Sequence, residues 1–402
     1  MMLRRTIGIA FAGLMGAFSV GQAFTIDGKA PTVKFNNSNL NPLLFTPDMQ
    51  AQFESKMNTE VGVAFDKTIV DARTKLAGFK DQKQLAQGMA NANVYSTNSA
   101  TLQGFQNYSL FAVSSGFMLG LQAPSLSVSP GSIGKDIAKE GDLYAGVGVG
   151  FTYLNIGINC SKFLLPGLYL NAKYGGLSQD VGDFSMDFKV MGVGVNYKIL
   201  EPKSFVGLVK WRGISVGSGF YMQMDKLNMK IVPDSLTTPA HFREAVLSGA
   251  TTAQDSADKK TLLDQMGYTA SNPDANVTLT PEFNMGLDIS TYTVPLEVNT
   301  AVALLWGIIN VNAGLGMDMN FGSAKIVLEG ESLAKISSDT TKVTFSPAKV
   351  KVDGSTDNGP SFARMRAMTG VGLGLGPVKL DIPLIYYFNS GLAFGVTAAV
   401  VW

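Results

Sequence analysis

Gly391-Leu-Ala-Phe-Gly-Val-Thr-Ala-Ala-Val-Val-Trp402 is the stretch that decides the fold of this 402-residue chain. Alternate residues of a β-strand point to opposite faces, so one face of the segment is apolar throughout and the other carries small residues. The apolar face consists of Leu392, Phe394, Val396, Ala398, Val400 and Trp402. In a transmembrane β-barrel such a strand turns its apolar face to lipid, its small face to the lumen and its terminal aromatic ring to the interface. An interior strand of a soluble sheet is the alternative interpretation.

The first residues have the pattern of a secretory signal peptide. A basic start precedes an apolar run over residues 7–20, and the small residues Gly21 and Ala23 precede a cleavage site. The run is shorter than the roughly 20 apolar residues of a membrane-spanning helix. We therefore expect cleavage after Ala23, a mature chain that begins at Phe24, and a final location in the bacterial outer membrane.

The composition argues against several classes of protein. Hydrophobic residues make up 46% of the chain and charged residues 16%, yet no later segment has the apolar length of a membrane helix. Apolar residues placed on alternate strand positions produce this combination. The net charge of +1 gives no sign of a nucleic-acid partner. A single cysteine, Cys160, and a single histidine, His241, predict no enzyme, no cofactor and no metal site.

A long amphipathic helix is predicted near the N-terminus. Thr46 suits the N-cap and Pro47 the first helical position. The apolar stripe that follows has three- and four-residue spacing and consists of Met49, Phe53, Met57, Val61, Phe65, Ile69, Ala72, Leu76 and Phe79. We assign residues 24–100 to a helical N-terminal segment, which either plugs a barrel or packs on its periplasmic side.

From about residue 105 the period of the apolar pattern changes to two. We assign residues 101–402 to an antiparallel transmembrane β-barrel of twelve strands, with 14 as the alternative. The strands are expected at residues 105–121, 143–158, 166–175, 184–199, 204–222, 277–290, 295–309, 313–328, 341–352, 361–375, 378–388 and 391–402. Two strands change their apolar parity, at Gly192 and at Gly213, where a β-bulge is expected. A polar insert with two short helical patterns occupies residues 224–276.

The connections between these strands are unequal in length. With the C-terminus in the periplasm, the external connections are residues 122–142, 176–183, 224–276 and 353–360. The periplasmic ones are then residues 159–165, 200–203, 291–294 and 329–340. Long external loops and mostly short periplasmic turns are typical of outer-membrane barrels.

Charges within the strands are expected to face the lumen, because Arg or Lys in mid-bilayer lipid costs about 2–4 kcal/mol. Ten charged residues lie on the parity opposite the large apolar ones: Lys173, Asp187, Lys189, Asp288, Glu297, Asp318, Arg364, Arg366, Lys379 and Asp381. They either neutralise one another across a closed wall or line a pore or head-group site. Glycine runs at residues 146–150 and 370–376 lie in strands and so are not phosphate loops. On the lumen face they leave space or let a plug approach.

The combination of signal peptide, helical N-terminal segment, barrel and terminal aromatic strand resembles the long-chain fatty-acid transporter (FadL-like) family of outer-membrane proteins. Asn41-Pro42-Leu43 is similar to the Asn-Pro motif of the N-terminal hatch in that family. The resemblance implies a plugged barrel that passes hydrophobic substrates, although the chain counts 12 strands, not 14, and has a longer N-terminal helix. The pattern also resembles spirochaete outer-membrane surface proteins, some of them transporter-like and others host-binding adhesins.

Two functions therefore remain open. The first is an outer-membrane transport barrel that passes small hydrophobic or amphipathic solutes, with the N-terminal helix as plug. The second is a surface-exposed adhesin or antigen that binds a host ligand through its external loops. Both require the lipid of the outer membrane and the barrel-assembly machinery as partners.

Overall fold

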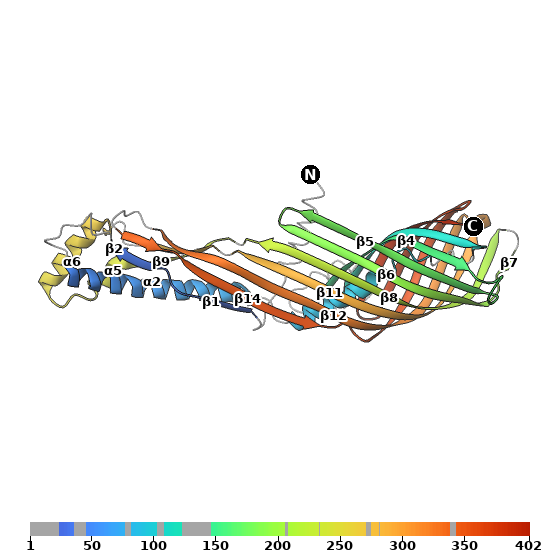
Figure 1. Ribbon diagram of the computed structural model, residues 1–402, viewed down its shortest axis with the longest axis horizontal. Coiled ribbons are helices and arrows are strands. Elements are labelled where there is room, and N and C mark those ends of the chain that lie inside the picture. Colours follow the sequence, from blue (N-terminus) through green and yellow to red (C-terminus); the bar gives the residue numbers. More distant parts are fainter. Residues whose placement is uncertain are drawn as a thin grey trace.

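The computed structural model describes residues 24–35, 46–76, 82–102, 108–122, 146–205, 208–232, 234–270, 275–280, 282–337 and 343–402. The expected signal peptide, the Asn41-Pro42-Leu43 motif and Phe79 lie outside the described residues. The described part is an elongated molecule, with a β-barrel at one end and helices at the other (Figure 1). No described helix has both the length and the apolarity needed to cross a membrane.

Ten described strands close the barrel, and the predicted antiparallel transmembrane β-barrel is confirmed. In ring order they are β12 (Ile309–Ser337), β11 (Phe283–Leu304), β8 (Val209–Ile231), β6 (Phe184–Leu200), β5 (Leu168–Val181), β4 (Gly146–Asn159), β3 (Phe111–Gln122), β17 (Gly391–Val401), β16 (Val378–Tyr387) and β15 (Ala363–Leu375). β15 pairs with β12 again. β3 is the first ring strand along the chain and β17 is the last, and the two pair with each other.

The ring has fewer strands than predicted because two expected hairpins are continuous. The turn expected at residues 291–294 lies within β11, where the residues Thr-Tyr-Thr-Val favour a strand and contain no turn former. Pro295 is tolerated there: the ladder to β8 stops at Thr293 and resumes at Leu296 without a change of register.

The second merged pair involves β14 (Ala348–Asn358) and β15. Both pair with β12 in one register, since Asn358 lies opposite Ala324 and Ala363 lies opposite Met319. Residues 353–360, expected to form an external loop, therefore continue the barrel wall. β12 itself extends to Ser337, so residues 329–337, expected in a periplasmic connection, belong to a strand.

The two predicted parity changes have different outcomes. At Gly213 the backbone has φ +84° and the registers of β8 with both β11 and β6 shift, so the predicted bulge is confirmed. Around Gly192 the register of β6 with β8 is continuous from Phe184 to Lys198. The predicted bulge at Gly192 is wrong.

The two ends of the barrel differ in their connections. At the end that holds Trp402, the connections are short: residues 160–167, 201–208 (which include β7, Lys203–Phe205), 305–308 (which include η2, Leu305–Gly307) and 376–377. We call the opposite end the distal end. It has the long connections, residues 123–145 and 232–282, and the tight turns at residues 182–183 and 388–390.

At the distal end the sheet continues beyond the ring and carries a distal domain. β8, β11, β12 and β14 extend into it, together with β1 (Phe24–Gly28), β2 (Thr32–Phe35), β9 (Leu236–Ala240), β10 (Ala275–Thr280) and β13 (Val343–Ser346). α2 (Pro47–Leu76) lies along this extension, and α5 (Phe242–Leu247) and α6 (Ala253–Met266) lie at the tip (Figure 1). The amide of Met49 donates to the Thr46 hydroxyl, so the predicted start of the helix is confirmed.

A hydrophobic core holds the distal domain together. Six members of the predicted apolar stripe of α2 are buried in it: Phe53, Met57, Val61, Phe65, Ile69 and Ala72. They pack with residues of the insert, among them Phe242, Leu263 and Met266. A second helix, α3 (Gln82–Ser96), instead lies in the lumen, where it contacts β3, β4, β8, β11, β12, β14 and β17.

Candidate functional site

β11 shows where the membrane lies along the barrel wall. The Thr291 hydroxyl donates to the side-chain oxygen of Asn93 on α3, so the odd-numbered residues of β11 point inward. Leu296 and Val298 are 44% and 48% exposed, so the even-numbered residues point outward. From the distal end, the outward residues are Asn284, Gly286, Asp288 and Ser290, followed by Tyr292, Val294, Leu296 and Val298. The inward residues are Phe283, Met285, Leu287 and Ile289, followed by Thr291, Thr293, Glu297 and Asn299.

The polarity of the wall therefore inverts within one continuous strand. An apolar exterior with a polar interior suits lipid outside and water inside, whereas a polar exterior with an apolar interior suits a water-exposed domain. The apolar part of β11, residues 292–304, exceeds the roughly 9–11 residues that a tilted strand needs to cross a bilayer. β12 inverts near Gly322, from exposed Phe321 in the membrane part to the outward Lys325 in the distal part.

Aromatic pairs mark both edges of the apolar band. At its distal edge Phe220 stacks on Tyr292 with ring centroids 6.0 Å apart, and Phe321 meets Phe362 edge to face at 5.4 Å. At the other edge the exposed ring of Trp402 stacks on Phe111 at 4.3 Å. Aromatic girdles of this kind flank the lipid-facing band of outer-membrane barrels.

Three of the ten charged residues expected in the lumen lie on the outer face instead. Asp187 and Lys189 form an ion pair of 2.7 Å on β6, and Asp288 lies 3.5 Å from Lys226. Asp187 and Asp288 both lie opposite Lys226, next to Asp225, which points inward to α3. The expectation for these three needs correction, because they lie in the distal part, where the outer face is polar.

The other seven point inward, and three of them form one buried cluster. The guanidinium of Arg366 on β15 lies 2.9 Å from a Glu297 oxygen on β11 and 3.1 Å from an Asp318 oxygen on β12. Both Arg366 and Asp318 are almost fully buried. The cation is therefore neutralised by two carboxylates from neighbouring strands.

The remaining four inward charges lie at separate points of the lumen. The ammonium of Lys173 donates to the carbonyl of Thr97 and lies 4.1 Å from the ring centroid of Tyr221. Arg364 donates to the Ser361 hydroxyl and Lys379 to the Gly376 carbonyl. Asp381 is buried on β16.

α3 lies inside the ring in direct backbone contact with β3 and β4. Four glycines lie on the inward face of these strands, and a Cβ on any of them would collide with a carbonyl of α3 or of Ser96 at its end. At Gly148 such a Cβ would lie 2.1 Å from the Ala92 oxygen, and at Gly120 2.3 Å from the same atom. At Gly146 and Gly150 the corresponding distances, to Gly88 and Ser96, are 2.0 Å. The first predicted glycine run thus lies where α3 touches the wall.

Hydrogen bonds fix α3 to the rest of the wall. The Asn93 amide donates to Asp225 at 2.6 Å. The Tyr95 hydroxyl donates to the Gln122 side chain at 2.7 Å, and its ring stacks on Tyr387 with centroids 3.7 Å apart. Nearer the distal end, Ala86, Met89 and Ala90 pack in an apolar cluster with Phe188, Leu227, Leu287, Ile289, Ala324 and Ile326. Polar and apolar contacts thus both hold α3 in the lumen.

The helix inside the ring, α3, follows the predicted apolar stripe and lies within residues 24–100, which were assigned to the helical N-terminal segment. Met49, Phe53, Met57, Val61, Phe65 and Ile69 belong to α2, which lies outside the ring, and Leu76 ends that helix. α3 is rich in Ala, Asn and Gln. The available signal was indirect: a small-residue face on β3 and β4 requires a closely packed occupant.

A cavity of about 320 Å³ lies in the distal domain between α2 and the connection from α5 to α6. Phe53, Lys56, Val246 and Lys259 are among its lining residues. Among the residues that the structure describes, no three His, Cys, Asp or Glu side chains are grouped closely enough to hold a metal ion.

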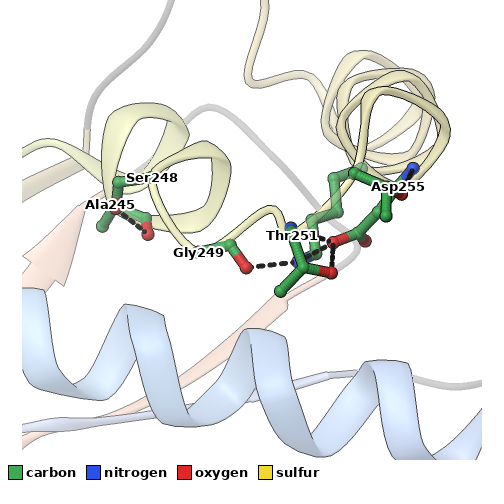
Figure 2. Close-up of polar contacts among 7 residues, drawn as sticks. Ala245, Ser248, Gly249, Thr251 and Asp255 are labelled. Carbon is green, nitrogen blue, oxygen red and sulfur yellow. Dashed lines mark hydrogen bonds and ion pairs between the residues drawn. The ribbon is translucent and has the colours of Figure 1, made fainter.

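Figure 2 shows the polar contacts that order this connection. The Lys259 ammonium donates to the Gly249 carbonyl and to Asp255, at 2.9 Å in both cases, and the Thr251 amide donates to Asp255 at 2.9 Å. These contacts hold the pKa of Asp255 below its usual value, with the Thr251 amide as the main cause and Lys259 as the second. Thr252 caps α6 by accepting from the Asp255 amide.

Comparisons with known proteins give one family match. A sequence profile described as Lsa36-like matches residues 47–402. A search of curated proteins finds no match. Among solved structures, the chain is similar to the translocator domain of the autotransporter NalP from Neisseria meningitidis, with 11% identity over 74% of this chain and 91% of that one, and a TM-score of 0.28.

Two hydrocarbon channels are also similar. The CymD monoaromatic hydrocarbon channel has 10% identity over 80% of this chain and 97% of that one, with a TM-score of 0.22. The P. putida toluene transporter TodX has 10% identity over 77% and 94%, with a TM-score of 0.22. Because these scores are low, the likenesses carry no functional argument.

Proposed function

The chain belongs to the Lsa36-like family, and we propose that it is a closed outer-membrane barrel that presents a ligand-binding domain at the cell surface. The observation that carries this proposal is the seat of α3. The carbonyls of Gly88, Ala92 and Ser96 rest on strand glycines, and the side chains of Asn93 and Tyr95 are bonded to the wall. A solute could pass only if these contacts were broken, whereas a membrane anchor requires them to persist.

The distal domain supplies the second support for a binding role. It is built from three separate stretches of the chain, the N-terminal segment, the insert at residues 232–282 and the ends of long strands, which share one hydrophobic core. Its cavity lies at the tip, between helices from two of these stretches. A domain of this kind is unnecessary for a simple pore, and it offers a surface that is remote from the membrane.

The test removes the tip without disturbing the barrel. Ala240 lies opposite Ala275 in the β9–β10 hairpin, so residues 241–274 can be replaced by an Asn-Gly turn that rejoins the two strands. We expect cells that express the full chain to adhere to a cultured epithelial layer, and cells with the shortened chain to adhere no better than cells without the protein. Heat-dependent electrophoretic mobility of the shortened chain controls for an intact barrel. Equal adhesion by the two chains would refute the proposal.

A plug-gated transport barrel is the second candidate, and the chemistry of the lumen favours it. Buried polar atoms without a hydrogen-bond partner among the described residues include Arg366 Nη1, Thr293 Oγ1 and Asn312 Nδ2, all on inward positions. Buried polar groups require hydrogen-bond partners, so this interior suits water and polar or amphipathic solutes better than hydrocarbon. Planar-bilayer recordings separate the candidates. A gated channel opens with α3 present, whereas a closed anchor conducts only after residues 82–96 are deleted.

A further inference from the structure

We propose that this barrel conveys its own N-terminal segment across the membrane, so that residues 24–76 stand on the external side while the chain that follows runs through the lumen. The inference concerns the path of the chain and goes beyond the proposed binding role. It rests on the direction of α3, on the closure of the ring and on the difference between the two barrel ends.

Contacts along α3 and the residues after it show the direction of the path. At the distal end, the Lys83 carbonyl accepts from Asn358 of β14. In mid-barrel, the Ala100 carbonyl accepts from Ser114 and Asn155. At the other end, the amides of Ser109 and Leu110 donate to the carbonyl of Trp402. The chain therefore enters the lumen at the distal end and leaves beside the C-terminus, where β3 begins.

The ring is closed at the level where this segment bonds to the wall. Each of the ten strands pairs with a neighbour on both sides, including β15 with β12 and β17 with β3, and the β4–β5 pairing from Leu154 to Asn159 includes Asn155, which bonds to Ala100. α2, β1 and β2 belong to the distal domain, and β1 pairs with the outer part of β14 from Phe24 to Gly28. Within the described chain, the lumen is thus the connection between the distal domain and β3.

The lengths of the connections assign the two ends to the two sides of the membrane. Outer-membrane barrels have short periplasmic turns and longer external loops, and the turns beside Trp402 are the short ones. The distal end is then external, and the N-terminal segment has crossed the membrane. Docking of α2 and β1 on the distal sheet, with burial of Ile26, Phe53 and Met57, holds the segment there.

Single cysteines test this placement in intact cells. The native thiol is removed by Cys160→Ser, and three exposed positions then receive one cysteine each: Ser55→Cys on α2, Lys260→Cys on the insert helix α6, and Lys162→Cys in a turn at the C-terminal end. The probe is a membrane-impermeant maleimide. We expect Ser55→Cys and Lys260→Cys to be labelled in intact cells as fully as in permeabilised cells, and Lys162→Cys only after permeabilisation.

Each other pattern overturns the inference in a distinct way. Labelling of Lys260→Cys without Ser55→Cys in intact cells would show that the N-terminal segment has not crossed, and would leave the binding role of the insert untouched. Labelling of Lys162→Cys in intact cells would show that the barrel has the opposite orientation. Loss of all labelling before permeabilisation would place the distal domain inside and would contradict both proposals.

Discussion

Gly148→Ala tests the seat of the plug with the smallest available change. The added Cβ would lie 2.1 Å from the Ala92 oxygen, against the 3.4 Å at which ordinary van der Waals contact begins, so α3 must move by 1.3 Å. It has little room to do so, because Asn93 is bonded to Asp225 at 2.6 Å across the lumen. Overpacking of a core costs about 1–3 kcal/mol. Replacing a strand glycine stabilises the strand by about 0.5–1 kcal/mol through lower backbone entropy of the unfolded chain, which leaves a net loss of up to about 2.5 kcal/mol.

The matched control is Gly286→Ala on β11. This glycine points outward, and its added Cβ meets only the tip of Asn228 at 3.3 Å and Val327 at 3.8 Å. We expect its free energy of unfolding to equal or slightly exceed that of the parent chain. Urea unfolding of both variants in lipid vesicles, followed by tryptophan fluorescence, measures the difference, and planar-bilayer recordings report whether α3 still seals the lumen. If Gly148→Ala unfolds at the same urea concentration as the control and shows no conductance in the bilayer recordings, α3 does not rest on β4.

Three further predictions test the membrane boundary, the charge cluster and the distal tip. Leu296→Arg should lower the free energy of unfolding by about 2–4 kcal/mol, since it faces lipid, whereas Asn284→Arg on the same face should leave it nearly unchanged; equal losses in urea titrations would contradict the polarity inversion. Arg366→Met should cost about 3–5 kcal/mol because it leaves buried carboxylates without their cation, and a loss below 1 kcal/mol in the same assay would show that the cluster is hydrated. Asp255→Asn should speed hydrogen exchange of the α6 amides at neutral pH. The lowered pKa of the Asp255 carboxyl stabilises the fold above its usual pKa of 3.8, and this effect is lost as the pH falls through the folded pKa. The exchange rates of the variant and the parent should therefore become equal at low pH. A constant difference between the two rates across that range would exclude the carboxylate as the cause.

The periodicity of the sequence determined a large part of the fold. The alternation from Leu392 to Trp402 was sufficient to identify a lipid-facing strand, because the period of two is a local property of extended backbone. The start of α2 was also predicted from a local signal, the capping residue Thr46. The bulge at Gly213 was predicted from a glycine at a change of apolar parity, and this glycine has a positive φ in the structure. The expected long connection after β8 is found at residues 232–282, and the expected short connections are found at residues 160–167 and 201–208.

Tertiary structure alone decided the strand count, the position of α3 and the sidedness of Asp187, Lys189 and Asp288. A period of two separates the two faces of a strand but does not say which solvent each face meets. Along β11 the outer face changes from water-exposed to lipid-exposed although the strand is continuous. Likewise, whether residues 291–294 turn or continue depends on the ladders to β8 and β12, which involve residues far away in the chain. Which part of residues 24–100 enters the ring could not be predicted, because α3 packs against the small residues of β3 and β4, and that fit exists only once the ring has closed.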